Sequence, residues 1–289
     1  MKILVTGGSG FLGSHVADTL STKGHKVTIF DKRKSRWLRK DQKICLGNIM
    51  NYERTAKAIK GVKVIFHIAA LSDLEEAMFK PLETVRNNIL GTVNILELAR
   101  KYKVKRVIYA SSIYSTSIQG GFYRCSKRAA EDYIEEFNKR YGLEFTILRY
   151  GSLYGSRSGL ENGIYRVADS VLKKRRIHYT GMKNAVRKYI HVKDAAEATA
   201  DMISSKYRNR YVNITGNKSY KVTELFEIVS DIFGSRLNVR YDHNRDTGHY
   251  TKFPKPFKIK KGINYKFKKN IELKYGIESL LSSMRDKKI

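Results

Sequence analysis

The stretch Thr6-Gly7-Gly8-Ser9-Gly10-Phe11-Leu12-Gly13 decides the fold class, because it joins a short apolar run at 2–6 to a helical pattern at 11–23. Glycine at 7, 10 and 13 lets the backbone turn tightly, approach a pyrophosphate closely and pack the helix on the strand. The N-terminus of that helix would face the phosphates. The stretch therefore predicts a dinucleotide site lined by Gly7, Gly10, Phe11, Leu12 and Gly13.

Short apolar runs alternate with helical patterns through the first half of the chain. Strands are expected at 2–6, 26–30, 62–68, 106–111, 144–149 and 210–214. Helices are expected at 11–23, 52–59, 81–102 and 123–141, and less regularly at 164–174, 192–204 and 222–233. This βαβαβ order predicts an α/β fold with a Rossmann-type, doubly wound parallel sheet and a smaller C-terminal substrate lobe.

The domain boundary is expected near the point where the alternation loosens. We assign residues 1–155 to the dinucleotide-binding Rossmann domain and 156–289 to the substrate-binding lobe. Residues 185–215 are expected to return to the Rossmann domain, because they contain a further strand pattern.

The net charge is unusually high. Lysine and arginine number 57 and aspartate and glutamate 27, which gives a formal net charge of +30. This exceeds what solubility needs, so an anionic partner has to be considered. The basic runs are dispersed along the chain, for example at 32–34, 173–176 and 258–261. Dispersal favours a solvated, compositionally biased surface, and leaves nucleic acid or an anionic membrane as the alternative.

The cysteines and the apolar segments bear on the compartment. Cys45 and Cys125 lack the spacing of metal ligands, so we expect free thiols in a reducing compartment and no metal site. The N-terminal apolar run is too short for a signal peptide, and no run of 18 apolar residues occurs. A cytoplasmic protein without a membrane span is expected.

Asp31 ends the second predicted strand and bears on the choice of cofactor. Its carboxylate can accept hydrogen bonds from the adenosine ribose hydroxyls and would repel the 2′-phosphate of NADP. Lys32 and Arg33 stand beside it and could attract that phosphate. We favour NAD over NADP.

Tyr123 and Lys127 are four residues apart at the start of a predicted helix, so they share one face. A phenol titrates near pH ~10 when unperturbed, so a nearby ammonium and an oxidised nicotinamide must favour the phenolate before it can deprotonate a sugar hydroxyl. Ser112, at the end of a predicted strand, could hydrogen-bond the same oxygen. These three residues are the predicted catalytic set.

At this point the sequence resembles the extended short-chain dehydrogenase/reductases, and among them the nucleotide-sugar epimerase/dehydratase family. The similar segments cover most of the chain. They are TGGSGFLGSH at 6–15, Gly47-Asn48-Ile49, Phe66-His67-Ile68-Ala69-Ala70, Asn88-Ile89-Leu90-Gly91-Thr92, Leu148-Arg149-Tyr150-Gly151-Ser152-Leu153-Tyr154-Gly155, Arg187-Lys188-Tyr189-Ile190-His191-Val192-Lys193-Asp194 and Val212-Asn213-Ile214.

The resemblance implies roles for named residues. Ser112, Tyr123 and Lys127 would be the catalytic triad, and the partner molecule would be a nucleotide-diphosphate sugar. Further residues would line the NAD site: Asp31, Lys32, Asn48, Ile49, Ala69, Asn88 and Tyr150, together with Tyr123 and Lys127. Ser152, Arg187 and Arg245 would bind substrate. Two guanidinium groups match a pyrophosphate because each offers planar paired donors, although a surface ion pair is the alternative for Arg245.

Several positions depart from the family pattern. Asn48 replaces the usual Asp, and its amide oxygen can still accept from an adenine amine. Ser152 stands where the family usually has Asn, and its shorter side chain reaches less far toward the substrate diphosphate. The identity of the substrate nucleotide is therefore not predicted. Only ten residues, 113–122, separate Ser112 from Tyr123, which is shorter than usual and predicts a more open sugar pocket.

The two residues that follow Ser112 bear on the type of reaction. Dehydratases carry an Asp-Glu pair there, and this chain has Ile113-Tyr114. We therefore expect an NAD-dependent nucleotide-sugar epimerase that works by reversible hydride transfer through a keto-sugar. The alternatives are an NAD(P)-dependent keto-sugar-nucleotide reductase and, in a different class, a nucleic-acid-binding protein on a recycled dinucleotide fold. A homodimer through the helices at 81–102 and 123–141 is expected from the family.

Overall fold

The computed structural model describes residues 1–174, 176–180, 183, 185–234, 237–242 and 262–285. The described chain divides into two compact units, which are treated separately below. The first contains residues 1–150, 196–214 and 262–265, and the second contains 151–195, 215–242 and 266–285, apart from the undescribed positions. The chain thus crosses from one unit to the other more than once.

The first unit is built on a parallel eight-stranded sheet in the order β14-β11-β6-β5-β4-β1-β2-β3. The strands are β1 Lys2–Thr6, β2 Lys26–Asp31, β3 Lys43–Leu46, β4 Val64–His67, β5 Arg106–Ser112, β6 Glu144–Tyr150, β11 Arg210–Ile214 and β14 Ile263–Asn264. The chain runs outward from β1 to β3 and then continues on the other side of β1 with β4. This reversal is the switch point at which doubly wound sheets bind ligands. The predicted Rossmann-type sheet is confirmed.

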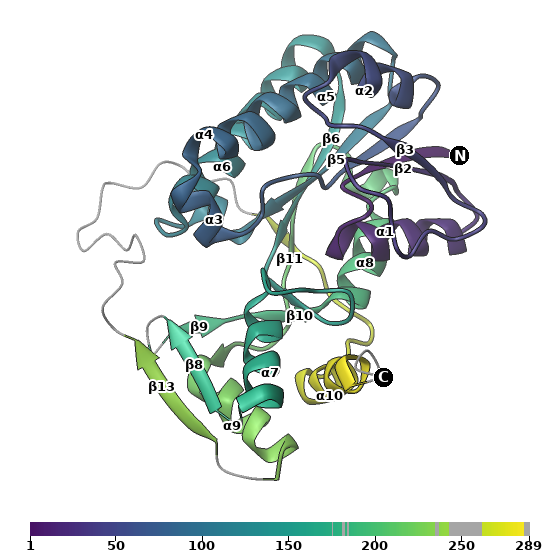
Figure 1. The fold of residues 1–289 in the computed structure, drawn as a ribbon. Coiled ribbons are helices and arrows are strands. Elements are labelled where there is room, and N and C mark those ends of the chain that lie inside the picture. Colours follow the sequence, from purple (N-terminus) through teal and green to yellow (C-terminus); the bar gives the residue numbers. More distant parts are fainter. Residues whose placement is uncertain (175, 181–182, 184, 235–236, 243–261, 286–289) are drawn as a thin grey trace. The chain divides into compact units, whose positions relative to one another are not determined.

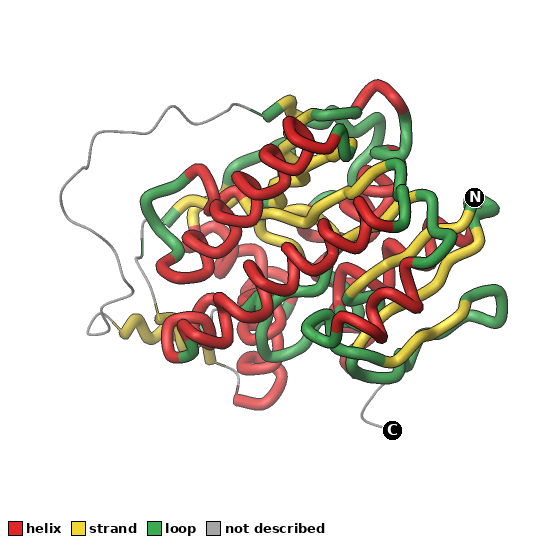
Figure 2. Tube along the Cα trace, turned by 90° about the horizontal axis from the view of Figure 1, so that it is seen from above, coloured by secondary structure: helices red, strands yellow, loops and turns green. Residues whose placement is uncertain are grey.

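Helices cover both faces of this sheet (Figure 1). α1 Phe11–Thr22 and the part of α8 Val192–Asp201 that belongs to this unit lie on one face. The other face carries α2 Tyr52–Ile59, α5 Gly91–Lys101 and α6 Gly121–Tyr141. Figure 2 shows the strands in yellow beside the red helices that cover them. Two short helices, α3 Leu74–Phe79 and α4 Pro81–Thr84, precede α5, and short 3-10 turns occur at Ile113–Thr116 and Ser205–Tyr207.

The helix expected at 81–102 is interrupted. A π-helical segment, Val85–Leu90, separates α4 from α5 and contains Asn88. A π-bulge shifts the register of the side chains that follow it, and such bulges are frequent at functional sites. Here it accompanies the inward placement of Asn88, which is buried.

Burial explains why the strands are nearly continuous apolar runs. All seven residues of β5 are buried, as expected for a parallel strand covered on both faces. The core between the sheet and helices α2, α5 and α6 includes Leu4, Ile65, Ile95 and Ile134. α6 ends where Gly142 adopts a left-handed conformation at φ 67°, which suits glycine at a helix C-terminus.

The second unit packs helices and short strands around its own core. Its elements are β7 Ser152–Tyr154, α7 Gly163–Lys174, β8 Arg176–Thr180, β9 Val186–Arg187, β10 Tyr189–His191, the start of α8, β12 Tyr220–Lys221, α9 Val222–Ile232, β13 Asn238–Asp242 and α10 Leu273–Arg285. Three two-stranded pairs form: β7 with β10, β9 with β12, and β8 with β13. The core includes Val171, Phe226, Ile277 and Leu280.

Within the described part of the chain, none of the helices combines the length and the apolar character needed to cross a bilayer.

Candidate active site

The glycine-rich turn leaves no room for side chains. Gly7 has φ 72°, and a Cβ there would lie 2.7 Å from the backbone nitrogen of Ala69. A Cβ at Gly13 would lie 2.1 Å from the carbonyl oxygen of Gly7, and one at Gly10 would lie 3.2 Å from that oxygen. The backbone of Gly7 therefore lies close to the backbone of Ala69 and of the first turn of α1, and this open, side-chain-free turn suits close approach to a pyrophosphate.

The start of α1 suits an anion. Gly10 caps the helix without a side-chain hydrogen bond, and the first turn holds no acidic residue. Backbone N–H groups at a helix start have no intrahelical acceptor and carry partial positive charge. Leu12 is buried and Phe11 is half-buried. This end of the helix fits the phosphates of a dinucleotide.

Asp31 is held at the end of β2 by backbone donors. One carboxylate oxygen accepts from the backbone nitrogen of Ser9 and the other from that of Arg33, each at 3.0 Å. Each oxygen keeps a further lone pair, so the carboxylate can also accept from two ribose hydroxyls. The side chain of Lys32 is exposed beside it. The fixed carboxylate and the glycine turn together fit an adenine dinucleotide without a 2′-phosphate.

Asn48 and Ile49 follow β3, a strand that the sequence did not predict. The side-chain oxygen of exposed Asn48 accepts from the backbone nitrogen of Met50 at 3.0 Å. Ile49 is buried against Gly91, where a Cβ would lie 2.4 Å from its Cδ1 atom. Asn94 donates from its side chain to the carbonyl of Ile49 at 3.2 Å. This segment is thus fixed to the start of α5.

A buried histidine links the glycine turn to the segment after β4. Thr6 Oγ1 accepts from the backbone nitrogens of Ile68 and Ala69, so its proton is directed to His67 Nδ1 at 2.7 Å. His67 Nε2 then donates to Thr92 Oγ1 at 3.0 Å. Burial lowers the pKa of His67 to about 3, and the charge of Lys127 adds to this effect, so the ring is neutral.

Asn88 is 1% exposed and uses its amide inside the protein. Its oxygen accepts from the backbone nitrogen of Leu71 at 2.7 Å, and its nitrogen donates to the carbonyl of Leu71 at 2.9 Å. The same nitrogen donates to Ser126 Oγ at 2.9 Å. The residue therefore connects the 69–71 segment with helix α6.

The three predicted catalytic residues come together at the C-terminal end of β5 and the start of α6. Ser112 ends β5, where its hydroxyl accepts from the backbone nitrogen of Tyr114 at 3.3 Å and lowers the pKa of the Tyr123 phenol. Lys127, one helical turn beyond Tyr123, places its ammonium 5.7 Å from the centre of the phenol ring and donates to the carbonyl of Ala110 at 2.8 Å. All three side chains are buried.

Burial dominates the electrostatics of this triad. It raises the pKa of Tyr123 to about 12, while the hydrogen bond from Ser112 opposes the rise. It lowers the pKa of Lys127 to about 7, and the nearby carboxylate of Glu131 opposes the fall. A phenolate–ammonium pair is thus costly in the free protein, and additional positive charge beside Tyr123 is needed for the phenol to act as a base near neutrality.

Tyr150 lies at the end of β6, as the register partner of Ser112. Its hydroxyl hydrogen-bonds Thr199 Oγ1 at 2.6 Å, and burial raises its pKa. Tyr150 therefore lies at the same end of the parallel strands as Ser112.

Two of the predicted substrate residues, Ser152 and Arg187, fall in the second unit. Ser152 begins β7, and its backbone nitrogen donates to the carbonyl of Lys188 at 3.0 Å. Arg187, in β9, lies two residues before Tyr189, the register partner of Ser152. Its Nη1 donates to the carbonyl of Val186 at 3.1 Å. Arg245 lies outside the described residues.

Sequence reasoning missed the polar residues behind the triad. Ser111, Glu131 and Arg149 form a buried hydrogen-bonded group. Glu131 continues the four-residue spacing of Tyr123 and Lys127, but its partners Ser111 and Arg149 lie in two different strands, so their meeting depends on tertiary packing.

Comparison with known proteins identifies the family to which the chain belongs. The model of the NAD dependent epimerase/dehydratase family matches residues 3–215. The chain belongs to this family. It is therefore an NAD-dependent enzyme of the extended short-chain dehydrogenase/reductase type.

Individual relatives cover nearly the whole chain. A putative UDP-glucose 4-epimerase of Methanocaldococcus jannaschii is 31% identical over 316 residues, covering 98% of both chains. A UDP-N-acetyl-alpha-D-glucosaminuronate decarboxylase of Bacillus cytotoxicus is 28% identical, covering 82% of each. The crystal structure of UDP-glucose 4-epimerase with UDP-glucose from Thermotoga maritima is similar with a TM-score of 0.86 and 26% identity, covering 100% of both chains.

Proposed function

We propose that this enzyme interconverts two epimers of a UDP-sugar at carbon 4, with NAD as its resident cofactor. The observation that carries the proposal is the placement of Ser112, Tyr123 and Lys127 together at the edge of the sheet where the glycine turn also lies. The similarity to 4-epimerases along the full length of the chain supports the choice of reaction and of UDP.

In this proposal the residues move one proton and hold the reacting hydroxyl. Tyr123 takes the proton of the sugar hydroxyl as base and returns it as acid. Ser112 hydrogen-bonds the phenol and orients it, and Lys127 stabilises the phenolate by its charge. NAD, when bound, would supply reversible hydride transfer and the positive nicotinamide charge. Because this transfer would restore the cofactor in each turnover, the enzyme would need no added oxidant.

The residues after Ser112 favour epimerisation over dehydration. A dehydratase needs an acid to expel a hydroxyl from the sugar. Ile113 and Tyr114 occupy these positions, in the short turn Ile113–Thr116 between β5 and α6. Neither is a carboxylic acid, so the side chains here support only the oxidation and return steps.

A UDP-sugar-acid decarboxylase is the second candidate, because relatives with that printed activity cover much of the chain. Oxidation at carbon 4 makes the carboxylate at carbon 6 part of a β-keto acid, which loses carbon dioxide readily. The same triad would serve that first step. The two candidates therefore share the base and the first oxidation, and they differ in whether the keto-sugar is reduced again or loses carbon dioxide.

The experiment is a substrate panel followed by NMR. Purified enzyme is incubated without added cofactor with UDP-glucose, UDP-N-acetylglucosamine and UDP-glucuronate, and with GDP- and dTDP-glucose for comparison. The proposal expects one UDP-sugar to reach an equilibrium mixture of 4-epimers, and Tyr123→Phe to abolish the reaction. Release of carbon dioxide from UDP-glucuronate would select the decarboxylase. Stoichiometric consumption of added NADPH would select a reductase. RNA binding that weakens steeply with salt, without turnover, would select the nucleic-acid hypothesis.

We further propose a homodimer through the helices at 81–102 and 123–141. Leu82, Val85, Leu90 and Tyr133 expose large apolar side chains on these helices. α5 and α6 also pack against each other within one chain, so a two-fold pairing would give a four-helix bundle. Light scattering should give twice the mass of the chain, and Leu90→Lys with Tyr133→Lys should give a monomer.

A further inference from the structure

Glu131 lies one helical turn beyond Lys127 on α6 and is 1% exposed. Its Oε1 accepts from Ser111 Oγ at 2.5 Å and from Arg149 Nε at 3.1 Å. Its Oε2 accepts from Arg149 Nη2 at 2.6 Å. A paired guanidinium with two nearly parallel bonds holds a carboxylate in one orientation. Glu131 is thus a fixed, charged group inside the core.

The partners of Glu131 adjoin the functional residues. Ser111 and Arg149 are register partners on the neighbouring strands β5 and β6. Ser111 immediately precedes Ser112, and Arg149 immediately precedes Tyr150. A single carboxylate therefore ties the ends of both strands to the helix that carries Tyr123 and Lys127.

We propose that Glu131, held by Arg149, is a positioning residue that fixes the end of β5 against α6 and so sets the geometry between Ser112, Tyr123 and Lys127. The catalytic part of this inference rests on the proposed function. Nothing in the reaction itself uses Glu131, since its carboxylate is taken up by Ser111 and Arg149 behind the triad.

The charges around Lys127 give the proposal a second consequence. The titratable groups that face it are Tyr123 and Glu131 on α6, Tyr109 on β5 with its ring centre 4.9 Å from the ammonium, and His67 on β4. The two phenols and the histidine are neutral near pH 7. Of these groups Glu131 alone is negative, and it raises the pKa of Lys127 against the effect of burial. Loss of its charge should leave less of Lys127 protonated.

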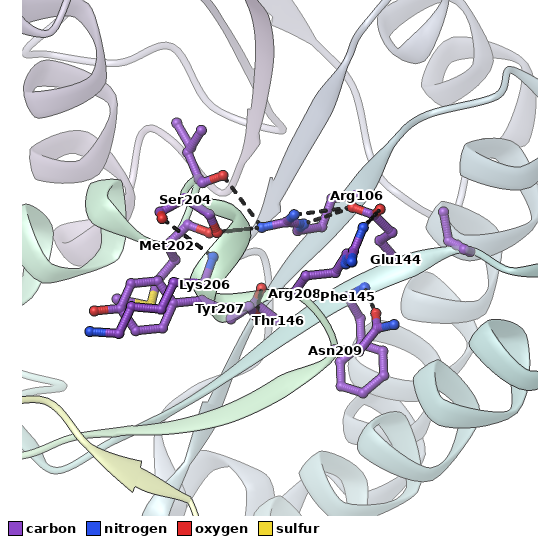
Figure 3. Close-up of polar contacts among 12 residues, drawn as sticks. Arg106, Glu144, Phe145, Thr146, Met202, Ser204, Lys206, Tyr207, Arg208 and Asn209 are labelled. Carbon is purple, nitrogen blue, oxygen red and sulfur yellow. Dashed lines mark hydrogen bonds and ion pairs between the residues drawn. The ribbon is translucent and has the colours of Figure 1, made fainter.

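A matched control pair joins the same two strands at their opposite ends (Figure 3). Arg106 begins β5 and Glu144 begins β6, and they too are register partners. Two nitrogens of Arg106 donate to Glu144 Oε2, at 3.2 and 3.1 Å, and Arg106 Nη1 donates to the carbonyl of Ser204 at 2.9 Å. Glu144→Gln therefore removes a comparable charge far from the triad.

The test compares Glu131→Gln, Ser111→Ala and Glu144→Gln with the wild type in the NAD-containing enzyme. Hydrogen exchange of peptides covering 108–116 and 119–128 reads the positioning without any substrate. Thermal unfolding reports general stability. Turnover of the UDP-sugar that the wild type accepts is measured as kcat and KM across pH. Ser111→Ala leaves the ion pair intact, so it keeps the test decisive if Glu131→Gln does not fold.

The expected result is faster exchange at 108–116 in Glu131→Gln and Ser111→Ala, and not in Glu144→Gln. For Glu131→Gln we expect kcat to fall about 10²-fold with little change in KM, as for a small displacement of reacting groups. The alkaline limb of its pH profile for kcat should move about one pH unit lower, because loss of the Glu131 charge lowers the pKa of Lys127.

The proposal is overturned if exchange at 108–116 matches the wild type in Glu131→Gln or, should that variant not fold, in Ser111→Ala. It is also overturned if Glu144→Gln changes exchange and kcat to the same extent, because the effect would then be loss of stability. A wild type that turns over none of the sugars would refute the proposed function, while the exchange comparison would still decide the positioning.

Discussion

The side-chain nitrogen of Asn88 lies 2.9 Å from the hydroxyl of Ser126, and this bond joins two parts of the site that are far apart in sequence. Ser126 in turn donates to the carbonyl of Tyr123 at 2.8 Å. On its other side, Asn88 pairs with both backbone groups of Leu71. The segment after β4 and the start of α6 are therefore held by one buried amide.

Asn88→Ala should weaken this connection. Leu71 and Ser126 would lose partners in a buried region, which typically costs about 1–3 kcal/mol. We expect a lower melting temperature and reduced NAD retention, measured by thermal unfolding and by absorbance of released cofactor. Asn87→Ala is the matched control, because the Asn87 side chain bonds to Glu83 within the same helical segment. Equal losses in the two variants would contradict this assignment.

Asp31→Ser should change the cofactor preference. The variant loses the carboxylate that accepts from ribose hydroxyls and that repels a 2′-phosphate, while Lys32 and Arg33 remain. We expect NAD to bind at least about tenfold more weakly, an effect of about 1.4 kcal/mol, and NADP to gain relative to NAD. Titration of both cofactors by calorimetry checks this. An unchanged ratio of the two dissociation constants would show that Asp31 does not contact the ribose.

His67 should make the fold sensitive to acid. Its pKa in the folded chain is about 3 because of burial, below the ordinary value of 6.5. The unfolded chain therefore binds a proton first, and stability falls as pH drops from 6.5 towards 3. The slope from this group is at most about 1.4 kcal/mol per pH unit. Chemical unfolding at several pH values should show a shallower slope for His67→Gln than for the wild type. Parallel slopes would mean that His67 is already protonated in the folded chain.

Lys127→Met should raise the pH at which the enzyme works. Burial already raises the pKa of Tyr123 to about 12, and this substitution removes the ammonium that lies 5.7 Å from the centre of the phenol ring. The acid limb of kcat should therefore move to higher pH, and kcat near pH 7 should fall about 10²-fold or more. Lys127→Arg, which keeps a charge, is the comparison. A uniform loss at every pH would indicate that Lys127 acts only on substrate or cofactor binding.

The fold could be predicted from the sequence where period and composition agree. β1, β11 and the helix α2 appear at the expected residues. β1 is a nearly continuous buried apolar run, β11 alternates between buried and less buried residues, and both patterns are typical of strands. β3 is short and half-buried, with lysine at its start, so it gave no such signal. α10 was missed although Leu273, Ile277 and Leu280 recur at four- and three-residue spacing, so its helical pattern was readable in the sequence.

Of the candidate site, only the residues proposed to act on the substrate could be predicted from the sequence. Tyr123, Lys127 and Ser112 are recognisable by spacing and by their place at strand and helix ends. The π-helical interruption before α5 could not be recognised in this way. Asn88 fits an ordinary helical pattern, and only the structure shows that its amide bonds Leu71 and Ser126. The same is true of Glu131, whose partners come from two strands. Such contacts depend on tertiary packing, which a local pattern does not contain.

The most direct test of the central claim follows the hydrogen at carbon 4. The UDP-sugar that the enzyme accepts in the panel, carrying deuterium at that carbon, is incubated with the enzyme in ordinary water without added cofactor, and the products are analysed by NMR and mass spectrometry. The account predicts a 4-epimer that retains deuterium at carbon 4, because the same hydride leaves and returns while Tyr123 moves only the hydroxyl proton. Product that has lost the deuterium to water, or no epimer in the wild type while NAD remains bound, would contradict it.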